Sequence, residues 1–281
     1  MSHLSEKISS GLPLIMGILN VTPDSFSDGG RYDSLSSALK RAHFMFNEGA
    51  DIIDIGGEST RPGSDPIDEE TQLSRVIPVI KALSSNYSMS DVARVISIDT
   101  TRSKVAGYAV SAGASLVNDV SAGTDDPLMF EVVARLNVPI VLMHRQGTSK
   151  NMQDNPHYTN VVEEVIDFLR LRAECALAAG ISRNNILVDP GIGFGKTRLH
   201  NLQLINNLHR LVSELAYPVL LGASRKRFMG AMCQEPEPED LLGATIATTV
   251  LGALAGVRVF RVHDIKPNRQ AVIVTQATMA V

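Results

Sequence analysis

The chain has 281 residues, of which 44% are hydrophobic, 20% are charged and 5% are aromatic, and its formal net charge at pH 7 is -4. This composition predicts a globular protein with a large core, and the length suits one α/β barrel. The small negative charge argues against wholesale nucleic-acid binding, so an anionic ligand must be met by locally placed cations. Two distant cysteines, Cys175 and Cys233, predict reduced thiols in a cytoplasmic protein.

Two segments have some features of targeting or membrane sequences. We expect residues 1–13 to be an N-terminal extension rather than a signal peptide, because they contain Glu6 and Lys7 but no apolar run. Residues 241–257 carry no charge, but they are short for a membrane span. We expect a helix there that is buried on most of its circumference, partly by a second subunit, which favours a homodimer.

Apolar and amphipathic runs alternate along the chain. The expected strands cover residues 14–19, 51–55, 95–98, 116–117, 139–143, 186–188, 219–221 and 257–262. The expected helices cover residues 34–47 (capped by Ser34), 66–83, 103–112, 127–136, 160–179, 201–211, 226–255 and 268–280. Eight strand–helix repeats without a linker predict a single-domain α/β fold, a (β/α)8 TIM barrel over residues 14–281. The competing architecture is an open doubly wound sheet, but residues 17–20 lack its dinucleotide-binding glycine turn.

The most distinctive stretch is residues 186–197, where aliphatic residues run into Asp189 and a loop with glycines at alternate positions. This pattern predicts a short buried strand whose carboxylate lies at the ligand-binding end of the barrel. The triplet Gly195-Lys196-Thr197 is similar to the end of a phosphate-binding P-loop, but Pro190 stands where that motif needs glycine. The spacing does not fit a dinucleotide fingerprint either. We therefore interpret Asp189 as the floor of a polar pocket.

Nearly every expected strand ends in polar side chains at the end where barrels build active sites. The residues at these positions are Asn20, Glu58, Thr60, Arg61, Asp99, Asn118, Asp119, Met143, His144, Asp189, Ser224, Arg225, Lys226, Arg261 and His263. Loop chemistry explains any one of them but explains the whole ring poorly. The set suited to the guanidine-like edge of a heterocycle such as a 2-aminopyrimidinone is Asp99, Asn118 and Asp189. The set suited to a phosphate or diphosphate is Arg61, Lys226, Arg261 and His263.

Two long loops, residues 21–33 and 56–65, follow the first two expected strands. Their glycines, mixed with Ser, Thr, Asp and Arg, favour loops that close over a site and exclude water. Exposed linkers are the alternative for either loop alone. A glycosidase with Asp99 and Asp189 as paired acids is disfavoured, because the chain has no Trp and few other aromatic residues.

Residues 17–30, GILNVTPDSFSDGG, resemble the first signature of the dihydropteroate synthase family, and residues 56–63, GGESTRPG, resemble the second. Shorter matches follow in order at residues 97–100, 117–119, 143–144, 189–191, 224–226 and 261–264. The resemblance implies a TIM-barrel transferase of folate biosynthesis that uses Mg²⁺, typically as a homodimer. It implies the condensation of 7,8-dihydropterin-6-ylmethyl diphosphate with 4-aminobenzoate to 7,8-dihydropteroate and pyrophosphate, with sulfonamides as inhibitors.

The resemblance also implies roles for individual residues. The implied pterin site is Asp99, Asn118, Met143, Asp189, Lys226 and Arg261. The implied diphosphate site is Asn20, Thr60, Arg61, Arg261 and His263. The implied 4-aminobenzoate site is Phe26, Ser27, Thr60, Arg61, Pro62 and Ser224. The implied metal contacts are Asn20 and Asp28, and the implied catalytic residues are Asp99, Lys226 and Arg261.

The chemistry that we expect is a dissociative substitution. Diphosphate leaves once Mg²⁺ and cations neutralise it, the pterin delocalises the methylene cation beside Asp99, and the arylamine attacks. Three rivals are a methyltransferase domain that moves a methyl group from methyltetrahydrofolate to a corrinoid, a catalytically silent pterin binder, and a Schiff-base aldolase that uses Lys226. The methyltransferase should not need Arg261, His263 or the two long loops.

Overall fold

The computed structural model describes residues 4, 7–8, 12–22, 31–59, 63–86 and 94–281, and for residues 31–34 it describes the backbone alone. The strands are β1 (Leu14–Asn20), β2 (Ile52–Gly56), β3 (Val95–Asp99), β4 (Leu116–Asp119), β5 (Ile140–Met143), β6 (Ile186–Asp189), β7 (Leu220–Leu221) and β8 (Val259–Val262). All are parallel to their neighbours, in the order β6-β5-β4-β3-β2-β1-β8-β7. A parallel bridge between Val188 and Val219 joins the two edge strands, so the sheet closes. The predicted barrel is confirmed.

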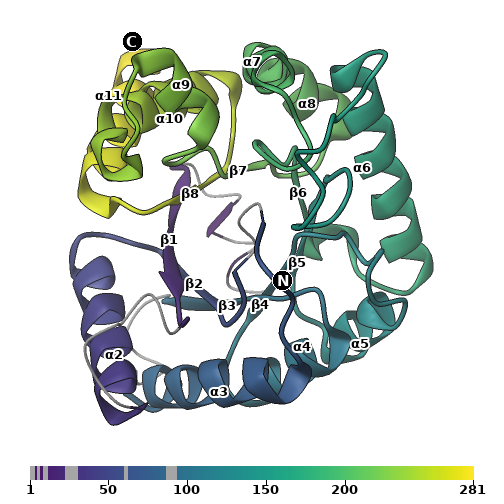
Figure 1. Cartoon of the computed structure of the whole chain (residues 1–281), viewed down its shortest axis with the longest axis vertical. Helices are drawn as coiled ribbons and strands as arrows, with labels where there is room; N and C mark the ends of the chain where they lie inside the picture. Colours follow the sequence, from purple (N-terminus) through teal and green to yellow (C-terminus); the bar gives the residue numbers. More distant parts are fainter. Residues whose placement is uncertain (1–3, 5–6, 9–11, 23–30, 60–62, 87–93) are drawn as a thin grey trace.

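Helices surround this barrel (Figure 1). They are α2 (Arg31–Asn47), α3 (Glu69–Asn86), α4 (Ser103–Ser111), α5 (Met129–Leu136), α6 (Val161–Ala178), α7 (Arg198–Asn206), α8 (Leu208–Leu215), α9 (Arg227–Cys233), α10 (Leu242–Ala255) and α11 (Ile265–Met279), with short 3-10 turns η2 (Arg183–Asn185) and η3 (Pro238–Asp240). In the described part of the chain, no helix combines the length and the hydropathy of a bilayer span.

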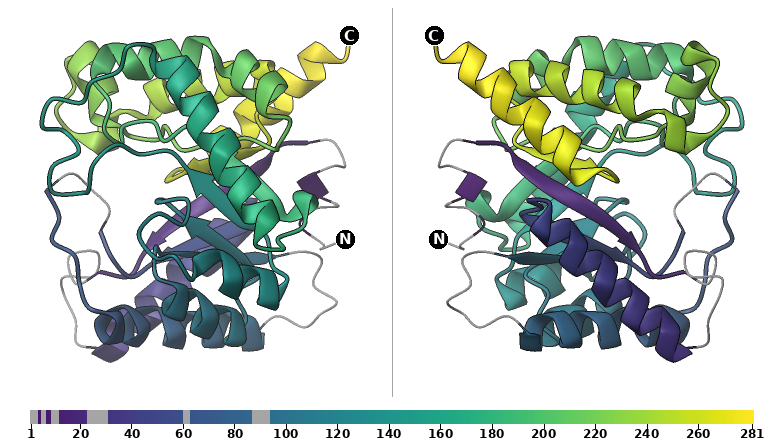
Figure 2. Two further views of the ribbon diagram at one scale, coloured as in Figure 1. Left: turned by 90° about the vertical axis from the view of Figure 1, so that its right-hand side faces the viewer. Right: turned by 90° about the vertical axis from the view of Figure 1, so that its left-hand side faces the viewer.

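The barrel interior has its own apolar cluster at the end where the strands begin. Inward-facing residues of all eight strands form this cluster together with Leu4 and Ile8 of the N-terminal segment. The side views show residues 7–8 at this end of the barrel (Figure 2). The N-terminal segment therefore contributes to the core, although the predicted division of the chain at residue 13 stays a prediction. The opposite end of the interior is left to polar side chains.

Several predicted helix boundaries are wrong. The first helix begins at Arg31, so Ser34 lies inside it and is not its cap. The second begins at Glu69 rather than residue 66, because the Asp68 carboxylate accepts hydrogen bonds from the Thr71 amide at 2.7 Å and its hydroxyl at 2.9 Å. The helix expected over residues 201–211 is two helices that meet at Asn207.

The end of the chain differs from the prediction in the same way. The expected helical stretch 226–255 is interrupted, because Gln234 adopts a left-handed backbone conformation with φ of 60° after α9. The last helix begins at Ile265, three residues earlier than predicted. Within one copy of the chain, helix α10 is buried on one face, with Leu251 and Leu254 50% and 53% exposed, so the predicted cover by a second subunit stays a prediction.

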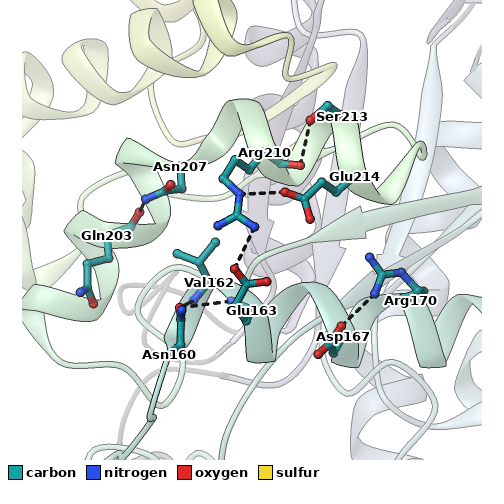
Figure 3. A network of polar contacts seen from close by, with 10 residues as sticks. All are labelled: Asn160, Val162, Glu163, Asp167, Arg170, Gln203, Asn207, Arg210, Ser213 and Glu214. Carbon is teal, nitrogen blue, oxygen red and sulfur yellow. Dashed lines mark hydrogen bonds and ion pairs between the residues drawn. The ribbon is translucent and has the colours of Figure 1, made fainter.

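On the outside of the barrel, an ion-pair network joins α6 and α8. Arg210 contacts Glu163 at 2.8 Å and Glu214 at 2.7 Å, and Asp167 pairs with Arg170 within α6 at 2.8 Å (Figure 3). These side chains are partly or largely exposed, so each pair contributes little to stability. Their exposure to solvent makes them suitable controls for buried charges.

Candidate active site

The carboxyl ends of the strands bring the predicted pocket residues together. Asp99 and Asn118 are register partners on β3 and β4, and Met143 and Asp189 are register partners on β5 and β6. All four residues are buried. Parallel strands place their last residues at one edge, and closure of the barrel turns that edge into a ring.

The centre of the ring is an ion-pair network around Arg261 of β8. Its Nε donates to Asp54 Oδ2 at 2.7 Å, and its Nη2 donates to Asp99 Oδ2 at 2.8 Å. Asn118 Nδ2 also donates to Asp54 Oδ2, at 2.9 Å. Arg261 therefore lies among the acidic residues of the pocket.

Asp54 is the pocket residue that the sequence analysis missed. It is fully buried in the middle of β2, with apolar residues on either side. Among the described residues, its Oδ1 and the neighbouring Ser97 Oγ have no hydrogen-bond partner. The available signal was the carboxylate inside the apolar run Ile-Ile-Asp-Ile, because an acid rarely stands in a buried strand without a partner.

Asp189 forms the floor that the sequence predicted. Its Oδ1 accepts a hydrogen bond from the Gly191 amide at 2.7 Å. A Cβ added at Gly222 would lie 3.7 Å from Asp189 Oδ2 and 3.9 Å from Arg261 Cβ, so this glycine leaves room between the two side chains. Burial raises the pKa of Asp189 to about 6, against the Gly191 amide and the charges of Lys226 and Arg261.

The pKa of Asp99 is raised further, to about 7, by burial. Arg261 opposes this rise and the carboxylate of Asp54 adds to it. Two of the acceptors for a heterocycle thus titrate close to neutral pH. The charge of the pocket consequently depends on both pH and ligand.

Lys226 and Ser224 lie on the opposite side of the ring, after β7. Lys226 Nζ lies 4.3 Å from the centroid of the Phe194 ring, a cation–π contact. Ser224 Oγ lies 3.0 Å from His263 Nδ1 and accepts a hydrogen bond from the His263 amide at 3.3 Å. Ser224 therefore contacts His263, whereas the cation–π contact of Lys226 is with Phe194.

Two other residues near the strand ends form hydrogen bonds that stabilise loops and do not line the pocket. The carboxylate of Asp119 accepts bonds from the Ser121 amide and hydroxyl at 2.8 and 2.7 Å. Arg225 donates from Nε and Nη2 to Asp264, at 3.1 and 2.8 Å. Both residues are polar for reasons of local structure.

Of the remaining predicted residues, Asn20 lies at the carboxyl end of β1. It is partly exposed, and a Cβ added at Gly56 would lie 3.5 Å from its Oδ1. The other predicted residues, which fall outside the described part of the chain, are Phe26, Ser27, Asp28, Thr60, Arg61 and Pro62. Their roles stay predictions.

The sequence is similar to known proteins over most of its length. A family model described as pterin binding enzyme matches residues 16–263. The dihydropteroate synthase of Clostridium beijerinckii is 45% identical, over 93% of this chain and 92% of its own. The mitochondrial folate synthesis bifunctional protein of Arabidopsis thaliana is 44% identical over 94% of this chain, which spans only 49% of that protein.

Solved structures agree with these similarities. The Xanthomonas albilineans dihydropteroate synthase with 4-aminobenzoic acid has a TM-score of 0.89 and 44% identity, over 96% of this chain and 94% of its own. The Yersinia pestis enzyme in a sulfonamide drug complex has a TM-score of 0.88 and 40% identity, over 96% and 95%. The Xanthomonas enzyme in complex with 7,8-dihydropteroate has a TM-score of 0.85 and 41% identity, over 96% and 95%.

Proposed function

The chain belongs to the pterin-binding enzyme family and, within it, to the dihydropteroate synthases, and on that premise we propose that it is a transferase of folate biosynthesis. It condenses 7,8-dihydropterin-6-ylmethyl diphosphate with 4-aminobenzoate to give 7,8-dihydropteroate and pyrophosphate. The observation that carries this proposal is the buried set of Asp54, Asp99, Asn118 and Asp189 around Arg261, in a chain 45% identical to a dihydropteroate synthase over 93% of its length.

The pocket suits the pterin ring because it offers buried acceptors and donors of known position. The carboxylates of Asp99 and Asp189 accept hydrogen bonds from the amino and ring N–H groups of a 2-aminopyrimidinone, and Asn118 supplies both donor and acceptor. Met143, buried beside Asp189, forms an apolar wall. Lys226 and Arg261 supply positive charge on the side where the diphosphate arm leaves the ring.

For the second substrate, the proposal keeps the residues that the family resemblance implies. Ser224 is the described member of the 4-aminobenzoate site. It contacts His263, the residue proposed for the diphosphate, at 3.0 Å, so the two subsites are adjacent. Sulfonamides, which resemble 4-aminobenzoate, are the proposed inhibitors, in line with the Yersinia pestis complex.

We propose Mg²⁺ as the cofactor, held by Asn20, Asp28 and the diphosphate of the substrate. Mg²⁺ usually keeps several waters and takes few protein oxygens beside substrate phosphates. The partly exposed amide of Asn20, with Gly56 beside it, fits such a donor set. When bound, the ion neutralises the departing diphosphate. The chain's own contribution is to orient the pterin and to hold Asp99 near the methylene carbon, where its negative charge stabilises a cation.

A homodimer is part of the proposal. Helices α10 and α11 pack together and present exposed apolar side chains, with Leu251 at 50%, Leu254 at 53%, Ile273 at 47% and Val274 at 64% exposure. A second copy of the chain that packs against this face removes its apolar surface from water. Light scattering after gel filtration should give the mass of a dimer for the unchanged protein. Leu251→Lys should give a monomer, and an unchanged mass contradicts this interface.

The free thiols Cys175 and Cys233 favour the cytoplasm as the compartment.

The test of the activity is pyrophosphate release from dihydropterin diphosphate with Mg²⁺, with and without 4-aminobenzoate. Release should rise with 4-aminobenzoate and yield dihydropteroate. Asp189→Asn should lower the rate strongly, whereas Asp167→Asn, on the exposed face of α6, should leave it unchanged. Binding of a pterin without release favours a silent binder or a methyltransferase, and trapping of substrate on Lys226 by borohydride favours an aldolase.

A further inference from the structure

Lys196, which follows β6 in the P-loop-like triplet, is buried with 2% of its surface exposed. Its Nζ lies 2.9 Å from the Gly191 carbonyl, 3.0 Å from the Phe194 carbonyl and 2.9 Å from His144 Nδ1. Burial lowers the pKa of Lys196 to about 7, and the three close acceptors, which match the three N–H donors of an ammonium group, favour the charged form against that effect. The lysine thus points into the protein and not towards a phosphate, and nothing in the proposed reaction uses it.

The ammonium is the centre around which the loop after β6 folds. Gly191, Gly193 and Gly195 have φ of 67°, 82° and 61°, a region that side chains disfavour. A Cβ at Gly191 would come within 1.8 Å of the His144 carbonyl, and one at Gly195 within 2.3 Å of the Gln146 carbonyl. The loop is therefore pressed against the segment after β5, and Lys196 bonds to both.

His144 completes this arrangement as a neutral acceptor. Burial, followed by the charge of Lys196, lowers the pKa of His144 to about 2. Its Nδ1 can then accept from the ammonium, which leaves the proton on Nε2. Its ring is fixed by an edge contact with Phe168, with centroids 4.9 Å apart. The acceptor is thus held rigidly in place.

The same loop reaches the pterin pocket at two points. The Gly191 amide donates a hydrogen bond to the Asp189 carboxylate, and Lys226 Nζ lies over the Phe194 ring. A Cβ at Gly193 would lie 3.1 Å from Lys226 Cδ, so the loop backbone also limits where that side chain can lie. Because Lys196 bonds to the carbonyls of Gly191 and Phe194, it fixes both supports at once.

We infer that Lys196 is a positioning residue of the pterin pocket: its buried ammonium holds the loop of residues 190–196 so that Asp189 and Lys226 face the pterin. This inference rests on the proposed function for its ligand. It adds a residue that touches neither substrate. It also gives a role to Lys196, which the sequence analysis considered only as part of a P-loop-like triplet.

The first variant is Lys196→Met, which keeps the length of the side chain and removes every donor. Pterin Kd and the KM for the pterin diphosphate should rise about tenfold to a hundredfold, the effect of losing hydrogen bonds from a charged group. The KM for 4-aminobenzoate should stay within about twofold, because the contact between Ser224 and His263 includes no residue of this loop. Hydrogen exchange of residues 190–196 should accelerate in the ligand-free protein. The matched control is Lys104→Met, which removes an exposed lysine paired with Glu69 and should change none of these quantities.

A second variant, Phe194→Leu, leaves Lys196 and its partners intact and removes the ring under Lys226. It should reproduce the selective loss of pterin affinity. The double variant should lose less than the sum of the two single effects, since both act through one contact. If Lys196→Met fails to fold, Phe194→Leu decides alone, and unchanged pterin affinity overturns the inference.

The outcomes separate this inference from the proposed function. An unchanged protein that binds no pterin removes the proposed function. Normal pterin binding by the unchanged protein and by Lys196→Met overturns the inference alone. An equal rise in both KM values, or fully additive effects in the double variant, assigns Lys196 a merely structural role and also overturns it.

Discussion

The substitution Asp54→Asn tests the architecture of the pocket, because it removes one charge and almost no volume. Asp54 Oδ2 accepts from Arg261 Nε at 2.7 Å and from Asn118 Nδ2 at 2.9 Å. Both donors bond to the same oxygen, so an asparagine has two choices: its oxygen takes that position and accepts both bonds without the negative charge, or its NH2 group takes that position and faces both donors. At least one hydrogen bond to a pterin-binding residue is weakened or lost.

The magnitude follows from the burial of the pair. Removing one partner of a buried ion pair costs about 3–5 kcal/mol, because the other charge is left uncompensated. Here Asp99 keeps its own bond to Arg261, and asparagine keeps an acceptor, so the cost should be roughly half, about 2 kcal/mol. Pterin affinity should fall at least about tenfold, since Asn118 and Arg261 are no longer held in place.

Urea unfolding measures the change in the free energy of unfolding, and calorimetric titration with a pterin measures the change in pterin affinity. Asp167→Asn is the matched control: it removes an exposed carboxylate paired with Arg170 at 2.8 Å and should change stability by less than about 0.5 kcal/mol (Figure 3). If Asp54→Asn unfolds at the same urea concentration as the unchanged protein and binds pterin equally well, the role assigned to Asp54 is wrong.

The remaining predictions concern pH, the glycine loop and the N-terminus. Because burial raises the pKa of Asp99 to about 7 and of Asp189 to about 6, ionising these groups opposes folding but creates the acceptors for pterin. As pH falls through these values, urea unfolding should show the protein gaining stability relative to Asp189→Asn, while titration shows pterin affinity declining. Gly191→Ala should lower the free energy of unfolding, measured in urea, by roughly 3 kcal/mol or more, because its Cβ would lie 1.8 Å from the His144 carbonyl oxygen. Ile8→Ala should cost about 2–4 kcal/mol in the same assay with kcat unchanged, since Ile8 packs at the end of the barrel opposite to the pocket.

The barrel could be predicted because its signal is repeated. Eight buried strands alternate with amphipathic helices, and an error at one boundary does not alter the count. The boundaries themselves were less accurate because capping is decided locally. Asp68, and not the preceding proline, starts α3 through its bonds to Thr71. Gln234 interrupts the helical stretch expected over residues 226–255 by adopting a left-handed conformation, which its residue type does not predict.

The pocket was predicted only where polar residues end a strand. Asp99, Asn118 and Asp189 were found because an apolar run stops at each of them. Asp54 was missed because its strand continues to Gly56, and its partners lie on strands remote in sequence. Asp119 shows the converse error, since a strand-end carboxylate can equally serve the loop that follows it. Sequence gives the position of a polar residue, but orientation depends on partners that only the folded chain brings together.

Arg261 shows how one side chain can serve the two roles implied for it. Its Nε is committed to Asp54, which is fully buried, whereas its Nη2 bonds to Asp99, one of the acceptors proposed for the pterin. A heterocycle that donates to Asp99 Oδ2 competes with Nη2 but leaves the bond to Asp54 undisturbed. The guanidinium then stays anchored at one edge while the other edge can turn towards an anionic arm. A lysine in the same place would have a single ammonium for both tasks, which is a physical reason for arginine at the centre of this ring.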